Sequence, residues 1–152
     1  MRCRSLTLCV LAILAPVCQG AQDELPAGPG RETAKKVCAG CHEMQTVVAT
    51  RYTRLGWRRM IGDMMSRGAE ANDAEAAEVF EYLVANFGKV NVNDAAAAEI
   101  QQGLNLSEAE AKAIVQYREQ NGKYKGFEEL EKTPGVSAEK LRGKRGLIAF
   151  SD

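Results

Sequence analysis

The sequence predicts an all-α protein built from two small helical units in succession. Between Trp57 and Arg67 the apolar residues recur with the i, i+3, i+4, i+7, i+8 spacing of one helix face. In the second half, Ser107 and Glu110 form the Ser-x-x-Glu capping box that opens a helix. The composition shifts after Gly88, and 152 residues are enough for two small domains. The 20 basic and 20 acidic side chains balance, so the net charge points to no particular class of partner.

The N-terminus has the features of a secretory signal peptide over residues 1–20. Two arginines precede an apolar run over residues 6–17, and Cys18 and Gly20 supply small residues at the −3 and −1 positions of a cleavage site. The run is short for a membrane span, so a retained N-terminal anchor is the alternative. No later segment is long enough to span a bilayer, so we expect no transmembrane segment in the mature chain. Residues 21–30 are rich in Gly and Pro and are predicted to be a flexible lead-in.

The stretch Cys38-Ala39-Gly40-Cys41-His42 is the attachment motif of a c-type haem. In such sites the two thiols bind the haem covalently, and the histidine is the proximal ligand of the iron. His42 is the only histidine of the chain. We therefore expect one covalent haem c, and because this haem is attached after export, a periplasmic location.

Three alternatives to haem attachment are weaker. A thioredoxin-like dithiol needs a βαβ context, whereas the surroundings here are predicted to be helical. A structural zinc site needs four ligands, and cleavage of the signal peptide would leave only Cys38, Cys41 and His42 of the usual soft ligands. A structural disulfide between the two cysteines would leave His42 unexplained.

In the first half, one helix is expected to carry this motif at its end, and the elements after the motif are expected to pack against it. In chain order the expected elements are a helix over residues 31–42, a loop or short helix over 46–54, a helix over 57–67 ended by Gly68, and a helix to Asn86 that is capped by Asn72 or Asp73 and stopped by Gly88. Fewer than 60 residues bury little core unaided. The apolar faces of the haem are therefore expected to complete the core.

The distal iron ligand is expected to be a methionine, the usual partner in electron-transfer cytochromes. The candidates are Met44, Met60, Met64 and Met65. Met44 follows His42 too closely to reach the opposite face of the haem. Methionines at helical spacing are usually core filler, so most of the remaining candidates should serve that purpose. The residues alone do not choose among Met60, Met64 and Met65.

Residues 31–88 resemble the small monohaem cytochrome c domains that accompany periplasmic dehydrogenases. The residues that carry the resemblance are Cys38, Cys41, His42, Trp57, Met64, Arg67-Gly68-Ala69 and Tyr82-Leu83. The resemblance implies a cytochrome c-like fold with Met64 as the axial sulfur, and Met60 or Met65 as alternatives. It also implies a periplasmic dehydrogenase or another redox protein as the partner.

A group of donors precedes and opens the methionine-bearing helix, consisting of Arg51, Tyr52, Arg54, Trp57, Arg58 and Arg59. Haem propionates are negatively charged and are often met by such side chains. We expect one or two of these residues to do so. The alternatives are a solvated basic face or a surface that steers an acidic redox partner.

Two helix–turn–helix units are expected in the second half. Their elements are a helix over residues 95–102 capped by Asn93 or Asp94, a helix from the Ser107 box to Asn121-Gly122, a short helix over 127–132, a helix that begins at Ser137, and a closing segment over 147–150. The domain boundaries are thus predicted at 31–88 and 89–152.

Residues 89–152 resemble the tandem helix-hairpin-helix domain of the ComEA family of competence DNA receptors. The matching residues are Val90-Asn91-Val92-Asn93, Ala95, Ala111 to Ile114, Tyr117-Arg118-Glu119, Asn121-Gly122, Phe127, Leu130 and Pro134-Gly135-Val136. The resemblance implies that backbone N–H groups at two Gly-hydrophobic-Gly turns hold DNA phosphates. Here the turns read Asn105-Leu106-Ser107 and Gly135-Val136-Ser137, so three of the four glycines are replaced.

The charge of this half gives a second view of DNA binding. From Lys89 to Asp152 there are ten basic and ten acidic residues, so the general attraction of a basic domain to DNA is missing. The residues expected to contact DNA, if the domain does so, are Gly135, Ser137, Lys140, Arg142, Lys144 and Arg145. A structural or protein-docking role for the domain is the alternative.

The function expected from the sequence is single-electron transfer by a periplasmic monohaem cytochrome c whose second half docks it to a partner. The alternative is a DNA-binding or DNA-uptake accessory that carries a c-type haem. An enzyme such as a peroxidase is not expected, because peroxidase chemistry favours a distal acid–base histidine and His42 is already used as the proximal ligand.

Overall fold

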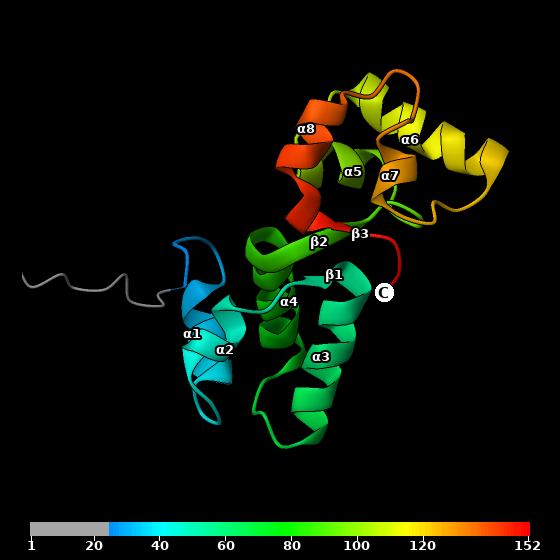
Figure 1. The fold of residues 1–152 in the computed structure, drawn as a ribbon. Helices are drawn as coiled ribbons and strands as arrows, with labels where there is room; N and C mark the ends of the chain where they lie inside the picture. Colours follow the sequence, from blue (N-terminus) through cyan, green and yellow to red (C-terminus); the bar gives the residue numbers. More distant parts are fainter. Residues whose placement is uncertain (1–24) are drawn as a thin grey trace, which may run out of the picture.

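The computed structural model describes residues 25–152. The predicted signal peptide over residues 1–20 and the first part of the lead-in lie outside the described residues. The described chain is mainly helical, and its helices form two groups on either side of a small sheet (Figure 1). Across residues 25–152, none of the helices has the length and apolar character needed to cross a membrane.

Along residues 25–152 the elements follow one another as two sets of four helices, with one strand in each set and one strand between the sets. The first set contains α1 (Arg31–Cys38), α2 (Met44–Val48), β1 (Tyr52–Thr53), α3 (Arg54–Ser66) and α4 (Asp73–Phe87). After β2 (Gly88–Asn91), the second set contains α5 (Ala97–Leu104), α6 (Glu108–Asn121), α7 (Phe127–Leu130), α8 (Ala138–Gly143), a 3₁₀ turn (Arg145–Leu147) and β3 (Ile148–Ala149).

The three-stranded sheet corrects the prediction of a purely helical protein. Its order is β1-β2-β3, with both pairs parallel. Tyr52 is opposite Gly88, and Val90 is opposite Ile148. Strands of two to four residues are too short to show an alternating pattern, which is why the sequence did not reveal them. The predicted boundary after Gly88 falls inside β2, a strand that pairs with both halves.

The helix starts in the first half follow local capping signals. Of the two caps predicted for α4, Asn72 is the one that the structure shows, and it forms a capping box with Glu75. The Oγ1 of Thr53 accepts a hydrogen bond from the backbone N–H of Gly56, so α3 begins three residues before Trp57. Gly88 is the extended residue that ends α4.

The N-terminal region differs from the prediction in two ways. The first helix ends at Cys38 and not at residue 42, so the Cys-x-x-Cys-His motif straddles its end. Residues 25–30, predicted to be part of a flexible lead-in, are held against the fold. The Leu25 side chain is buried, and the hydroxyl of Tyr82 donates a hydrogen bond of 2.7 Å to the carbonyl of Pro26.

The second half follows the prediction except at its first helix. This helix, α5, begins at Ala97, and neither Asn93 nor Asp94 caps it. Asn93 is buried and its side chain instead bonds to three backbone groups of two distant residues. Its Oδ1 accepts the N–H of Tyr124, and its Nδ2 donates to the carbonyls of Tyr124 and Phe150. Asp94 forms an ion pair with Lys123.

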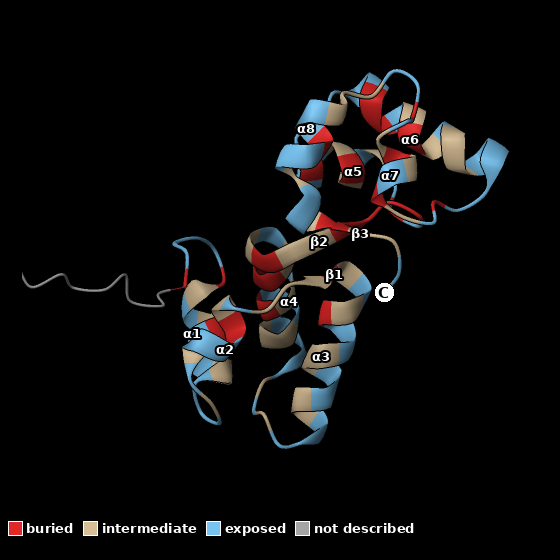
Figure 2. Ribbon diagram, in the orientation of Figure 1, coloured by how far each residue is buried: buried red, intermediate tan, exposed pale blue. Residues whose placement is uncertain are grey.

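Each half has its own buried cluster (Figure 2). In the second half the closing segment completes the core, because Ile148 is buried and Leu147 and Phe150 pack against the cluster. In the first half the largest contributors are Trp57 and residues of α4. Most of the apolar face of α3 is only half-buried, and it faces a cavity and not a packed core.

Candidate functional site

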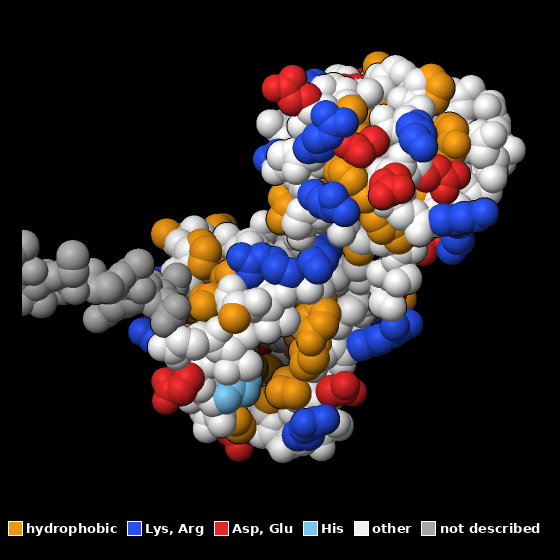
Figure 3. All heavy atoms as spheres, viewed as in Figure 1, with side chains coloured by type: hydrophobic (Ala, Val, Ile, Leu, Met, Phe, Trp, Pro, Cys, Tyr) orange, Lys and Arg blue, Asp and Glu red, His pale blue; other side chains and the backbone are white. Residues whose placement is uncertain are grey.

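A cavity of about 420 Å³ lies between α1–α2 and α3–α4, in the size range of ligand pockets. Most of its lining is apolar, and it includes Val37, Val47, Ile61, Val79 and Leu83. Figure 3 shows a hollow beside the histidine, bordered by hydrophobic side chains. The cavity is thus open to the surface at the residues of the Cys-x-x-Cys-His motif.

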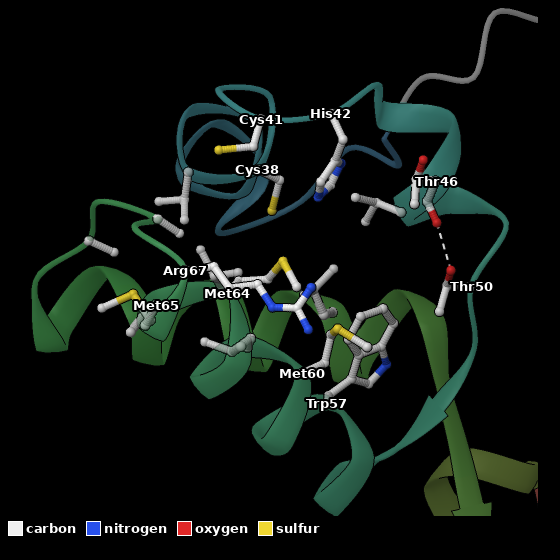
Figure 4. A pocket seen from close by; sticks show the side chains of 18 of the residues that line it. Cys38, Cys41, His42, Thr46, Thr50, Trp57, Met60, Met64, Met65 and Arg67 are labelled. Atoms are coloured by element: carbon white, nitrogen blue, oxygen red, sulfur yellow. Dashed lines mark hydrogen bonds between the residues drawn. The ribbon is translucent and has the colours of Figure 1, made fainter.

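Both cysteines and the histidine of the motif line this cavity. Cys38 is half-buried at the last position of α1, whereas Cys41 is exposed, and both are free thiols. Burial raises the pKa of the Cys38 thiol. In Figure 4, Cys38 and His42 point into the cavity from the same wall. No cluster of three or more His, Cys, Asp and Glu side chains within residues 25–152 is arranged to hold a metal ion.

The orientation of His42 leaves one ring nitrogen available. Its Nδ1 lies 3.3 Å from the backbone carbonyl oxygen of Glu43. A carbonyl oxygen only accepts hydrogen bonds, so the tautomer that makes this contact carries its proton on Nδ1. The other nitrogen, Nε2, is then an unprotonated electron-pair donor. A backbone carbonyl bound to one ring nitrogen is the usual way to orient a ligating histidine.

The opposite wall carries the candidate methionines. Met60, Met64 and Met65 all line the cavity from α3, as the helical spacing predicted. Figure 4 shows the sulfurs of Met60 and Met64 in the middle of the cavity, whereas Met65 lies toward the C-terminal end of α3. Met44 packs against the first-half cluster and does not line the cavity.

The sequence-based reasoning missed Arg67 as a residue of this site. It lines the cavity from the C-terminal end of α3. The helix ends there in a Schellman motif, with the N–H of Ala69 bound to the carbonyl of Met64 and the N–H of Gly68 bound to that of Met65. Gly68 has φ +101°, which favours glycine. The Arg-Gly-Ala turn directly after the methionine face was the available signal.

Most of the predicted propionate donors lie outside the cavity. Only Tyr52 and Trp57 line it, and the indole N–H of Trp57 already donates to the carbonyl of Phe87 at 3.0 Å. The arginines have other partners on the first half: Arg51 donates to the carbonyls of Val48 and Thr50, Arg54 pairs with Glu81, and Arg58 lies over the ring of Phe80. Arg59 is exposed and does not line the cavity.

The second candidate site consists of the two hairpin turns. Asn105 has φ +49° and Gly135 has φ +80°, so both turns use a left-handed residue despite the replaced glycines. Ser107 and Ser137 follow these turns, and their side chains cap α6 and α8. Both turns therefore begin with a residue in the left-handed region, the conformation that a glycine adopts readily.

A carboxylate occupies the space where these two helix starts meet. Glu110 accepts the N–H of Ser107 at 2.8 Å and the N–H of Ser137 at 3.3 Å. The ammonium of Lys140 donates to the same carboxylate at 2.9 Å. These hydrogen bonds, above all that from the Ser107 backbone, lower the pKa of Glu110 to about 2. Glu110 thus places a fixed negative charge at the two helix N-termini.

Of the four cations expected to contact DNA, three have partners within the chain. Besides Lys140, Arg142 Nε lies 2.5 Å from Glu131 Oε1, and the guanidinium of Arg145 lies 4.6 Å from the centre of the Phe127 ring. No such contact involves Lys144 among the described residues. Two of the four charges, those of Lys140 and Arg142, are therefore paired with carboxylates of the chain.

Comparison with known proteins supports this description of the second half. Residues 85–148 match the helix-hairpin-helix motif. This region is a helix-hairpin-helix domain. The chain is also 40% identical over 63 residues to an uncharacterized protein of Haemophilus influenzae, a match that covers 41% of this chain and 56% of the relative. No solved structure matches the chain.

Proposed function

We propose that this protein is a monohaem c-type cytochrome that carries single electrons, and that its helix-hairpin-helix domain docks it to a partner. One observation carries the proposal. The only histidine of the chain and the thiols of Cys38 and Cys41 line one apolar cavity of about 420 Å³, across which lies a methionine-bearing helix. A bound haem would supply a one-electron iron centre.

The residues around the cavity suit a haem. Cys38 and Cys41 would hold it by thioether bonds, and His42 would offer Nε2 to the iron because Nδ1 is turned to the Glu43 carbonyl. Met64 is the proposed second axial ligand, with Met60 and Met65 as the alternatives. A thioether in that position raises the reduction potential, and the apolar lining limits the access of water to the iron.

Covalent attachment is the first test. The full chain is expressed in a host with a cytochrome c maturation system, and denatured protein is examined by mass spectrometry and by haem staining. The wild type is expected to retain one haem, and the double variant Cys38→Ala, Cys41→Ala is expected to lose it. A wild-type chain that matures in the correct compartment without any covalent haem would refute the proposal.

The distal ligand is tested by separate Met60→Ala, Met64→Ala and Met65→Ala variants. We expect Met64→Ala alone to change the low-spin spectrum and to bind exogenous cyanide or CO readily. The other two variants serve as matched controls from the same helix face. A spectrum that changes only in Met60→Ala or Met65→Ala would move the assignment to that residue.

We propose the periplasm as the compartment and a dehydrogenase or another periplasmic redox protein as the partner. The support is the signal peptide predicted over residues 1–20 and the covalent haem motif, which is completed after export. Cell fractionation with haem staining tests the compartment. Cytoplasmic holoprotein would contradict it.

DNA binding is the second candidate function. The match of residues 85–148 to the helix-hairpin-helix motif favours it, as do the left-handed turn residues Asn105 and Gly135. The balanced charge and the Glu110 carboxylate at the helix N-termini weigh against it. Fluorescence anisotropy with duplex DNA at low and moderate salt tests whether the domain binds DNA. Binding through phosphate contacts should weaken steeply as the salt concentration rises. Absence of binding at low salt would eliminate this function.

A further inference from the structure

Among residues 25–152, Arg67 is the only Lys, Arg, Asp or Glu residue that lines the cavity. Figure 4 shows its guanidinium between the wall of His42 and the wall of Met60 and Trp57. A guanidinium stays protonated throughout the physiological pH range. The cavity therefore has one permanent positive charge on an otherwise mostly apolar lining.

The backbone fixes where this charge is attached. The N–H of Arg67 bonds to the carbonyls of Asp63 and Met64, and the Schellman bonds of Gly68 and Ala69 close the helix directly behind it. Arg67 is three residues after Met64, so the two side chains share one end of α3. The end of the helix is held by backbone bonds and by Gly68, not by the Arg67 side chain.

The charge of Arg67 is not neutralised within the part of the chain that the structure describes. Over residues 25–152, the guanidinium has neither a hydrogen-bond acceptor nor an ion-pair partner. Other arginines of the first half do have partners, such as Glu81 for Arg54 and the Phe80 ring for Arg58. The charge of Arg67 thus remains available to act on whatever the cavity holds.

We propose that Arg67 raises the reduction potential of the haem that the proposed function places in this cavity. When the iron gains an electron, its net charge falls by one unit, so a nearby fixed cation favours the reduced form over the oxidised form. Arg67 acts through space and is not a ligand. The inference rests on the proposed function, because it requires a haem between His42 and Met64.

The test is a spectroelectrochemical titration of the holoprotein at low and high ionic strength. Arg67→Gln is expected to shift the reduction equilibrium toward the oxidised form by up to about tenfold, equal to about 59 mV for a one-electron couple. Arg67→Lys keeps the charge and is expected to stay close to the wild type. Added salt should shrink the difference between wild type and Arg67→Gln, because salt screens exposed charges.

Arg59→Gln is the matched control, since Arg59 is an exposed arginine of the same helix that does not line the cavity. Its potential is expected to equal that of the wild type. An unchanged potential in Arg67→Gln, or a potential in Arg67→Lys as low as in Arg67→Gln, would overturn the role of the charge. Arg67→Ala provides a second neutral variant if Arg67→Gln matures poorly.

Failure of this inference is distinguishable from failure of the proposed function. A wild-type chain without covalent haem overturns both. A wild-type chain with a normal low-spin haem, together with variants of equal potential, overturns only the role of Arg67.

Discussion

Glu110 offers the sharpest test of how the helix-hairpin-helix domain is held together. Its carboxylate accepts hydrogen bonds from the backbone of Ser107 and of Ser137, and so links the starts of α6 and α8. It also pairs with Lys140. The replacement Glu110→Gln keeps the size of the side chain and one acceptor oxygen but removes the charge.

The expected loss of stability follows from the pKa and from the exposure of the pair. A pKa lowered from 4.5 to about 2 corresponds to roughly 3 kcal/mol at neutral pH. The Glu110 side chain is 10% exposed, but that of Lys140 is 54% exposed, so solvent screens part of the interaction. We therefore expect Glu110→Gln to lower the free energy of unfolding of the domain by about 2 kcal/mol.

The pH dependence has a defined sign. The pKa of Glu110 is lower in the folded protein than in the unfolded chain, so its contribution is fully present above pH 4.5. It is lost as the pH falls from about 4.5 toward about 2, where the folded carboxylate also takes up a proton. The difference between wild type and Glu110→Gln should therefore be largest at neutral pH and should shrink through this window.

Native-state hydrogen exchange of the α6 and α8 amides in the full chain measures this local stability at pH 7, and urea unfolding extends it to pH 3. Glu108→Gln is the matched control from the first turn of the same helix. Glu108 forms an exposed ion pair with Lys112, with both side chains 67% exposed, so its loss should cost much less stability than the loss of the Glu110 charge. The reasoning fails if the two variants lose equal stability at pH 7, or if the Glu110→Gln deficit persists undiminished at low pH.

Two further substitutions test the packing around the second half. Asn93→Ala removes a buried side chain with three hydrogen bonds to distant backbone groups. We expect it to lower the free energy of unfolding, measured in urea, by about 2 to 4 kcal/mol. A decrease below about 1 kcal/mol would contradict the structural role of these hydrogen bonds. Gly103→Ala should destabilise by about 1 to 3 kcal/mol although alanine favours helices, because its Cβ would lie 2.3 Å from the buried Val90 side chain. An unchanged or increased melting temperature of Gly103→Ala would contradict this, because it would show that the Val90 side chain moves aside at little cost.

The predictions that succeeded rest on signals contained within a few residues. The cap at Asn72, predicted there or at Asp73, the capping box at Ser107 and the cap at Ser137 each involve a side chain and an amide three positions apart, so the sequence was sufficient to find them. The sequence did not predict the sheet, because each of its strands pairs with a segment far away in the chain. Asn93 was misassigned for the same reason, since its partners at Tyr124 and Phe150 are remote in sequence.

The same distinction applies to the cavity. Cys38, Cys41 and His42 could be selected from the sequence because they form a motif of five residues, and the structure brings all three to one cavity. Three methionines share one helix face, so spacing alone did not separate them. The arginines near Trp57 were expected at the cavity, but partners on α4 and on the preceding loop hold several of them elsewhere. Arg67 reaches the cavity because α3 ends there, and the Arg67-Gly68-Ala69 turn marked that end in the sequence without indicating which way the Arg67 side chain points.

The strand β2 bears directly on the proposed docking role. It follows α4 without a linker and pairs on one side with β1, which leads into the cavity helix α3, and on the other side with β3 of the second half. Directly before β2, the carbonyl of Phe87 accepts a hydrogen bond from the indole of Trp57, which lines the cavity. A Cβ at Gly88 would lie 2.3 Å from the carbonyl oxygen of Val84, so the turn into β2 is built around a glycine.

Helical units joined by a flexible linker would reorient freely, whereas backbone pairing on both edges of β2 ties the helix-hairpin-helix domain to the wall of the cavity. A partner bound to the second half would therefore meet the cavity in a constant orientation. Electron transfer depends on such a fixed approach between two redox centres. The pairing of β2 with β1 and with β3 is therefore the structural feature on which the docking role that we propose for the second half depends.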